Sequence, residues 1–151
     1  MVQKTMRKGN PEKLAAAYQY QGKILLHAYS QTTAGVWISE NNVTEYTDEE
    51  LSTAAIASIL STSTAGIGHP ENWDGLFDSV IQMADVRSWE SFVLGRKYVG
   101  ISQIGEVIEF TPSRNMGSEE GFLPRLECAT RADCNSPLLH LKLLKAFELS
   151  E

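Results

Sequence analysis

The stretch YVGISQIGEVIEFT, residues 98–111, decides the fold class. β-Branched and aromatic residues alternate with small or polar ones on both sides of Gly105-Glu106. Two such runs joined by two residues are typical of a β-hairpin, which pairs its strands antiparallel. We therefore predict a sheet built from hairpins rather than from parallel strands linked by crossover helices.

The region before this hairpin contains two more segments rich in β-branched and aromatic residues, 14–29 and 35–46. In the second of them, the apolar runs 36–38 and 43–46 flank Ser39-Glu40-Asn41-Asn42. Asparagine tolerates the positive φ of a tight turn, so this pattern predicts another hairpin.

A capping box marks the first predicted helix. Thr47 is followed three residues later by Glu50, and the apolar positions from Leu51 to Ile59 keep a helical period. We expect the helix to begin at this box and to stop at Gly66 and Gly68.

The second half of the chain alternates helical and strand patterns. The pattern of residues 71–92 predicts two short helices or one bent helix. Residues 112–121 are rich in turn formers and are predicted to be an exposed loop, and residues 122–132 are predicted to be a strand. A final helix over 138–149 has a broad apolar face that we expect to be buried: Leu138, Leu141 and Leu144, with Leu139, Leu143 and Phe147. The prediction is a single α+β domain over residues 1–151, a largely antiparallel sheet with helices packed against it, with residues 1–11 as a loose segment.

The composition is that of an ordinary globular chain. The 151 residues are 42% hydrophobic, 9% aromatic and 21% charged, and no apolar run approaches the roughly 20 residues of a membrane-spanning helix. The first residues, MVQKTMRKGN, have no apolar stretch behind their basic residues, so neither export nor membrane insertion is expected. We interpret Cys128 and Cys134 as free thiols and expect a cytoplasmic location.

The net charge of −6 is distributed unevenly. Residues 24–86 contain no lysine or arginine and nine acidic side chains: Glu40, Glu45, Asp48, Glu49, Glu50, Glu71, Asp74, Asp78 and Asp85. Nucleic-acid binding depends on lysine and arginine at phosphates, so direct binding of DNA or RNA is not expected. A basic protein or a cation fits this segment better, although an acidic surface that only aids solubility is an equal alternative.

Motifs for the common catalytic chemistries are missing from the sequence. His27, His69 and His140 are scattered, and only the two cysteines form a close pair, so no zinc site is predicted. There is no G-x-S-x-G nucleophile motif and no phosphate-binding glycine loop. We predict no catalytic residue, no cofactor and no metal.

Two hypotheses from other classes remain open. In the first, His69 acts as a general base with Asp74 in a small hydrolase, although a histidine between glycine and proline is more often a turn residue. In the second, the chain is an oligomeric structural module joined through sheet edges. The loop 113–121 is either a functional segment or a flexible connector.

Residues 88–122 carry a family resemblance. Four segments form it: Ser88-Trp89-Glu90-Ser91-Phe92, Val99-Gly100-Ile101-Ser102, Ile108-Glu109-Phe110-Thr111-Pro112, and the loop SRNMGSEEGF. Together they resemble one family of immunity proteins of bacterial contact-dependent growth inhibition systems, the CdiI type. The resemblance implies a cytoplasmic, non-enzymatic inhibitor that binds the C-terminal toxin domain delivered by a neighbouring cell.

The acidic charge suggests how such an inhibitor would work. A toxin that acts on nucleic acid, such as a nuclease, has a basic cleft, and carboxylates that fill this cleft exclude the substrate. The partner-binding residues that we predict on this basis are Asp48, Glu49, Glu50, Glu71 and Asp74, with Glu119 and Glu120 of the loop as a second group.

Overall fold

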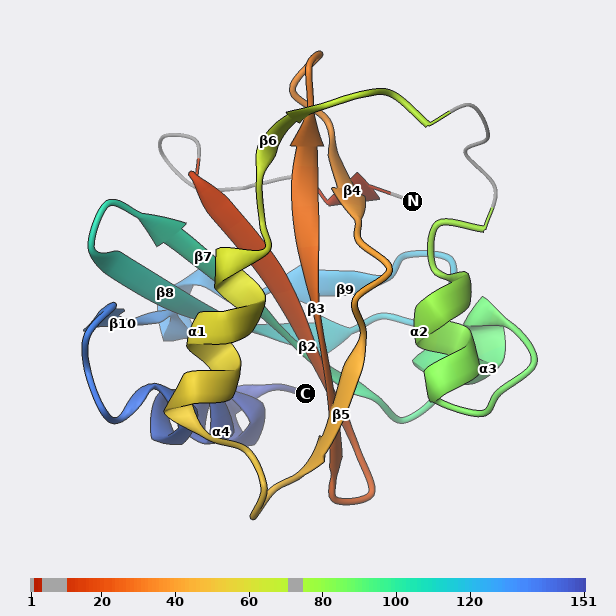
Figure 1. Cartoon of the computed structure of the whole chain (residues 1–151). Helices are drawn as coiled ribbons and strands as arrows, with labels where there is room; N and C mark the ends of the chain where they lie inside the picture. Colours follow the sequence, from red (N-terminus) through yellow and green to blue (C-terminus); the bar gives the residue numbers. More distant parts are fainter. Residues whose placement is uncertain (1, 4–10, 71–74) are drawn as a thin grey trace.

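One curled, largely antiparallel sheet organises the molecule (Figure 1). The computed structural model describes residues 2–3, 11–70 and 75–151, and in this part the sheet has ten strands in the main order β1-β4-β3-β2-β7-β8-β10. β5 and β6 also pair with β3, and β9 pairs with β8. The strands are β1 (Val2–Gln3), β2 (Lys13–Tyr20), β3 (Lys23–Thr32), β4 (Trp37–Ser39), β5 (Thr44–Thr47), β6 (Ala65–Ile67), β7 (Lys97–Ile104), β8 (Val107–Asn115), β9 (Phe122–Pro124) and β10 (Thr130–Asp133).

The helices cover both faces of the sheet. They are α1 (Thr53–Ser61), α2 (Asp78–Met83), α3 (Trp89–Val93) and α4 (Leu139–Leu149), with a short 3-10 turn at Leu126–Cys128. The α+β prediction is confirmed. The prediction of a loose segment over residues 1–11 falls mostly on residues 1 and 4–10, which lie outside the described residues. Within that segment the described residues 2–3 form β1, which pairs with β4.

Two hairpins form the centre of the sheet. Ile104 pairs with Val107 across the predicted turn Gly105-Glu106, which confirms the hairpin of β7 and β8. β2 and β3 form the second hairpin, whose turn residues Gln21 and Gly22 both have positive φ, as a two-residue hairpin turn of this hand requires. β2 pairs with β3 on one side and β7 on the other, so the two hairpins share one continuous sheet.

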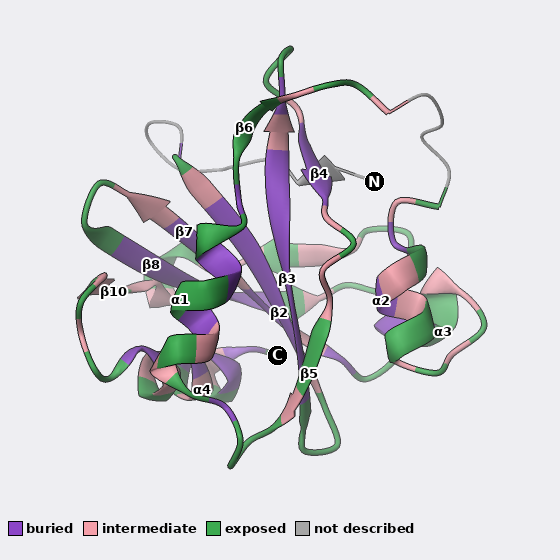
Figure 2. Cartoon of the chain, viewed as in Figure 1, coloured by how far each residue is buried: buried purple, intermediate pink, exposed green. Residues whose placement is uncertain are grey.

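Side-chain alternation along β2 separates two hydrophobic cores. Ala15 and Ala17 face the core under α1 and α4, and Leu14, Ala16 and Tyr18 face the core under α2 and α3. The central strands are buried from both sides, as Figure 2 shows. The helix pairs therefore lie on opposite faces of the sheet.

The capping box forms, but the helix begins later than predicted. The Thr47 amide donates to the Glu50 carboxylate at 2.9 Å, and the Glu50 amide donates to the Thr47 hydroxyl at 3.2 Å. This pair closes one turn after β5, and Ser52 then caps α1 by accepting from the Ala55 amide. The end of α1 was also predicted wrongly, because Gly66 lies inside β6, which pairs parallel with β3.

The hairpin predicted over 36–46 is wrong. β4 and β5 do not pair with each other, since both lie antiparallel along β3. The backbone leaves the ladder between them, where the Asn42 side-chain oxygen accepts from the Ala28 amide at 3.1 Å. One interrupted strand thus takes the place of two paired strands.

The segment after β8 also differs from its prediction. β8 continues to Asn115 with Pro112 and Ser113 buried, so the exposed loop covers only 116–121. The strand predicted over 122–132 is divided into β9 and β10 by the 3-10 turn. The final helix occupies its predicted place, and Leu139, Leu143 and Phe147 are buried as predicted. Leu144 is partly buried against the core, but Leu138 is 51% exposed and Leu141 is 50% exposed, so their predicted burial is wrong.

The second core contains a buried histidine. The His27 ring is fully buried among Tyr18, Tyr29 and Phe77, and its Nδ1 lies 3.2 Å from the Ser39 hydroxyl. Its Nε2 has no partner in the described residues. Burial lowers the pKa of His27 to about 4, so the neutral ring is the native form.

We expect His27 to make the fold sensitive to acid. The unfolded chain binds a proton at His27 near pH 6.5 and the folded chain only near pH 4. Because the unfolded state binds more protons in this window, stability falls as pH drops from about 6.5 to about 4, by about 3 kcal/mol. Urea denaturation at pH 7 and pH 4.5 should show a smaller loss for His27→Phe than for the parent and for the control His69→Ala. An equal loss in all three proteins would contradict this role.

Candidate partner-binding surface

The metal-site and hydrolase hypotheses can be compared with the described residues. No group of three or more histidine, cysteine, aspartate or glutamate side chains in this part of the chain is placed to hold a metal ion. Cys128 and Cys134 are both free. His69 is exposed, and Asp74, its partner in the hydrolase hypothesis, lies outside the described residues. In the same part of the chain no helix has the length and apolarity to cross a membrane.

Three adjoining hollows lie around Gly95, in the segment that links α3 to β7. The first hollow, of about 500 Å³, shares Gly95 with the second, of about 230 Å³. The second shares Tyr20 and Gln21, at the turn of β2 and β3, with the third, of about 320 Å³. We call this region the Gly95 surface. It is bordered by Tyr20, Gln21, Glu45, Asp48, Asp85, Glu90, Leu94, Gly95 and Arg96.

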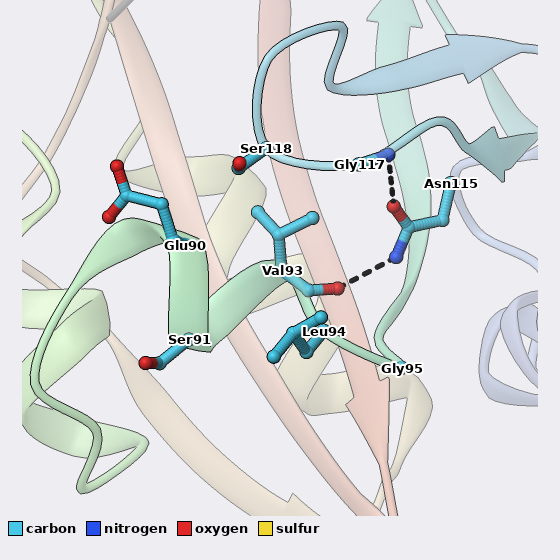
Figure 3. Close-up of a pocket in the computed structure, with 8 residues that line it drawn as sticks. All are labelled: Glu90, Ser91, Val93, Leu94, Gly95, Asn115, Gly117 and Ser118. Carbon is cyan, nitrogen blue, oxygen red and sulfur yellow. Dashed lines mark hydrogen bonds between the residues drawn. The ribbon is translucent and has the colours of Figure 1, made fainter.

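Asn115 holds the first hollow in shape (Figure 3). Its side-chain amide donates to the Val93 carbonyl at 2.7 Å and to the Arg96 carbonyl at 2.9 Å, and its oxygen accepts from the Gly117 amide at 3.0 Å. One side chain thereby connects the end of α3 to the loop after β8. The predicted loop is therefore anchored at its start and forms one wall of the hollow.

Gly95 is required by the backbone at the centre of the surface. Its φ is +70°, and a Cβ at this position would lie 3.1 Å from Cε1 of Tyr20. A larger residue would meet both a strained conformation and the Tyr20 ring. The chain turns here from α3 into β7, and Leu94 is left 73% exposed.

Carboxylates line the rim of all three hollows. Glu90 borders the first hollow, Asp48 the second, and Glu45 and Asp85 the third. Two of the basic side chains here already have partners. The Lys97 ammonium donates to the Phe147 carbonyl at 3.0 Å, and the Lys23 ammonium lies 3.8 Å from the Glu45 carboxylate. The surface therefore presents several carboxylates, of which Glu45 lies beside Lys23.

Apolar side chains lie beside these carboxylates. Leu94 is 73% exposed, Met83 is 42% exposed and Tyr20 is 37% exposed, and each lines one or more of the hollows. Exposed aromatic, methionine and leucine side chains next to a charged rim are typical of protein–protein interfaces. The geometry fits a protein partner better than a small substrate.

The structure places five of the seven predicted partner-binding residues. Asp48 borders the second hollow and accepts from the side-chain amide of Gln19 at 3.2 Å. Glu49 is exposed beside it. Glu50 is exposed but occupied by the capping box, and its hydrogen bonds from Thr47 lower the pKa of its carboxyl.

The other predicted residues are distributed between the loop and the segment that is not described. Glu119 and Glu120 are exposed in the loop, next to Ser118, which lines the first hollow. Glu71 and Asp74 lie outside the described residues. Asp48 of the first group thus lines the second hollow, and this hollow shares Gly95 with the first hollow, which is lined by Ser118 next to the second group.

Sequence reasoning missed Tyr20, Leu94 and Arg96. The motif Leu94-Gly95-Arg96 offered a signal, because a glycine after a short apolar helix marks a helix end that exposes its neighbours. It did not show that Tyr20, distant in sequence, would lie against this glycine. That placement depends on the pairing of β2 with β7.

Comparison with known proteins gives a match of fold. No protein-family model and no curated protein matches the chain. A protein of unknown function from Neisseria meningitidis is similar in structure, with a TM-score of 0.74 and 13% identity, over 96% of this chain and 100% of that one. A chain of the CdiA-CT/CdiI toxin and immunity complex from Yersinia pseudotuberculosis has a TM-score of 0.70 and 11% identity, over 92% of this chain and 97% of that one. The whole domain therefore shares its fold with a chain of a toxin–immunity complex.

Proposed function

We propose that this chain is a cytoplasmic immunity protein that binds and neutralises the toxin domain of a contact-dependent growth inhibition system. The observation that carries the proposal is the fold match, over nearly the whole length of both chains, to a chain of a toxin and immunity complex. The net charge of −6 favours the immunity role over the toxin role, because a toxin acting on nucleic acid needs a basic surface.

The Gly95 surface is the contact region that we assign to this function. Its rim carboxylates would meet a basic cleft, and Tyr20, Met83 and Leu94 would be covered by the partner. Buried apolar side chains supply most of the affinity of such an interface, and charges set the association rate. The toxin would be a nuclease whose cleft is closed to its substrate, and the inhibitor itself would not be an enzyme.

The proposal predicts a gene for a large secreted protein beside the gene of this chain, and co-purification with the C-terminal toxin domain of that protein is its test. We expect a complex of defined stoichiometry, and we expect cells that express this chain to survive expression of the toxin domain. Separate elution of the two proteins together with unprotected cells would overturn the proposal.

Charge reversal should slow association with the toxin domain. Asp48→Lys with Glu90→Lys removes two rim carboxylates that border different hollows. We expect the association rate at low salt to fall about tenfold and its salt dependence to weaken, while dissociation changes less. The matched control, Glu106→Lys with Glu148→Lys, changes the net charge equally at two exposed positions that line none of the three hollows. Stopped-flow measurement of association over a salt series tests this. Equal slowing by both pairs of substitutions would show that net charge, and not the carboxylates at the hollows, sets the association rate.

A further inference from the structure

Arg96 is a buried arginine that forms no ion pair within the described residues, although Glu45 lies near enough to act on its charge. Arg96 is only 7% exposed, and its Nε is buried without a hydrogen-bond partner. In the part of the chain that the structure describes, its side chain makes no ion pair within 4 Å. An arginine in this state is unusual, because buried guanidinium groups are normally paired with carboxylates.

Two aromatic rings and the backbone fix the position of this side chain. The guanidinium lies over the Phe92 ring at 4.2 Å and over the Tyr20 ring at 4.8 Å from the ring centroids. The Arg96 amide donates to the Val93 carbonyl at 3.2 Å, and the Arg96 carbonyl accepts from Asn115. Stacking on rings holds a cation in place but leaves its N–H donors free for an acceptor.

The guanidinium remains charged in this environment. Burial lowers the pKa of Arg96 from its ordinary value, while nearby Tyr20 and Glu45 oppose this change. An arginine stays protonated throughout the physiological range even so. A fixed positive charge therefore lines the third hollow of the Gly95 surface.

The hollow at Arg96 has the size for a side chain from another protein. It measures about 320 Å³ and is lined by Tyr20, Lys23, Glu45, Met83 and Asp85 around the arginine. Lys23 lies 3.8 Å from Glu45 and partly neutralises it, and Asp85 is exposed. A neutral carbonyl would satisfy the N–H donors but would leave the buried charge uncompensated.

We propose that Arg96 is the anchor for a carboxylate side chain, an aspartate or glutamate that projects from an otherwise basic surface of the partner protein. The carboxylate would take the planar donor fork of Arg96, and the basic residues around it would meet Asp85 and Asp48 on the rim. The assignment rests on the proposed function. It adds to that function one positively charged contact, Arg96, among the carboxylates of the Gly95 surface. This arrangement would fix the orientation of the partner, because a wholly basic surface would meet Arg96 with a like charge.

Arg96→Met tests the anchor against the toxin domain described above. We expect binding to weaken about thirtyfold or more while the melting temperature stays the same or rises, since an uncompensated buried charge is lost. The matched control is Arg87→Met, which removes the same charge from an exposed position outside the hollows. If Arg96→Met does not fold, Arg96→Lys keeps the charge and loses the fork, and we expect the same weakening. Binding by the folded variant within about threefold of the parent would overturn the anchor.

A scan of the toxin domain identifies the opposing carboxylate. Each aspartate and glutamate on its surface is changed to the amide, and one change should weaken binding to the parent but add no further loss with Arg96→Met. If no such residue exists, the guanidinium does not take a partner carboxylate.

Sodium acetate provides a test that does not depend on the toxin. In the free protein, the NMR signal of the Arg96 Nε–H should shift saturably with acetate and not with sodium chloride at equal ionic strength, while the Arg87 signal stays in place. If the parent fails to bind the toxin domain, the proposed function fails, and the acetate shift alone decides whether Arg96 is a carboxylate site. An unchanged Arg96 signal would overturn it. A shift with acetate combined with undisturbed toxin binding by Arg96→Met would assign the site to small anions instead.

Discussion

Replacing Phe147 by alanine is expected to lower the free energy of unfolding by about 3–5 kcal/mol, the range typical of a large side chain removed from a packed core. Phe147 is 1% exposed and belongs to the core between the sheet and helices α1 and α4. Its removal leaves a cavity on the face that α4 presents to β7 and β8. Urea denaturation monitored by tryptophan fluorescence measures the loss.

Leu141→Ala is the matched control on the same helix. Leu141 is 50% exposed, so its truncation should change the free energy of unfolding by no more than about 0.5 kcal/mol. This result would correct the sequence-based expectation that Leu141 is a core residue. A large loss for Leu141→Ala with a small loss for Phe147→Ala would contradict the orientation of α4.

Local patterns predicted those parts of the fold that depend on neighbours in sequence. The hairpin of β7 and β8 is defined by its two-residue turn and by alternation on both sides. The face of α4 was less predictable, because leucines at 138, 139, 141, 143 and 144 cover most of the helix circumference. Which of them is buried depends on where α4 meets the sheet.

Non-local pairing explains the elements that were predicted wrongly. β4 and β5 have the sequence of a hairpin, but β3 offers a free edge long enough to pair with both. The capping box at Thr47 satisfies its own hydrogen bonds in a single turn, and Ser52 provides the cap from which α1 continues. Short motifs therefore identified the correct local chemistry but not the start of the helix.

The candidate site was predictable in charge but not in shape. The acidic bias of residues 24–86 predicted Asp48, which the structure places at the Gly95 surface. Tyr20 and Arg96 could not be predicted, because they meet only through the pairing of β2 with β7. Leu94 was not singled out either, and it is exposed because the chain turns at Gly95.

Leu94→Asp is expected to weaken binding of the toxin domain about a hundredfold, because a charge would replace a large apolar side chain that the partner covers. Leu94 is the most exposed of the large hydrophobic residues in the described chain and lines the first hollow. It makes little contribution to either core, so the melting temperature should stay close to that of the parent. Stability and binding are therefore expected to separate at this position.

Calorimetric titration of the toxin domain into the parent, Leu94→Asp and Leu141→Asp tests most directly whether the Gly95 surface is the binding site. The control introduces the same charge at a leucine that is 50% exposed on α4 and lines none of the three hollows. We predict that Leu141→Asp binds like the parent and protects toxin-expressing cells, whereas Leu94→Asp does neither. Undiminished binding by Leu94→Asp, or equal weakening by both variants, would contradict the assignment of this surface.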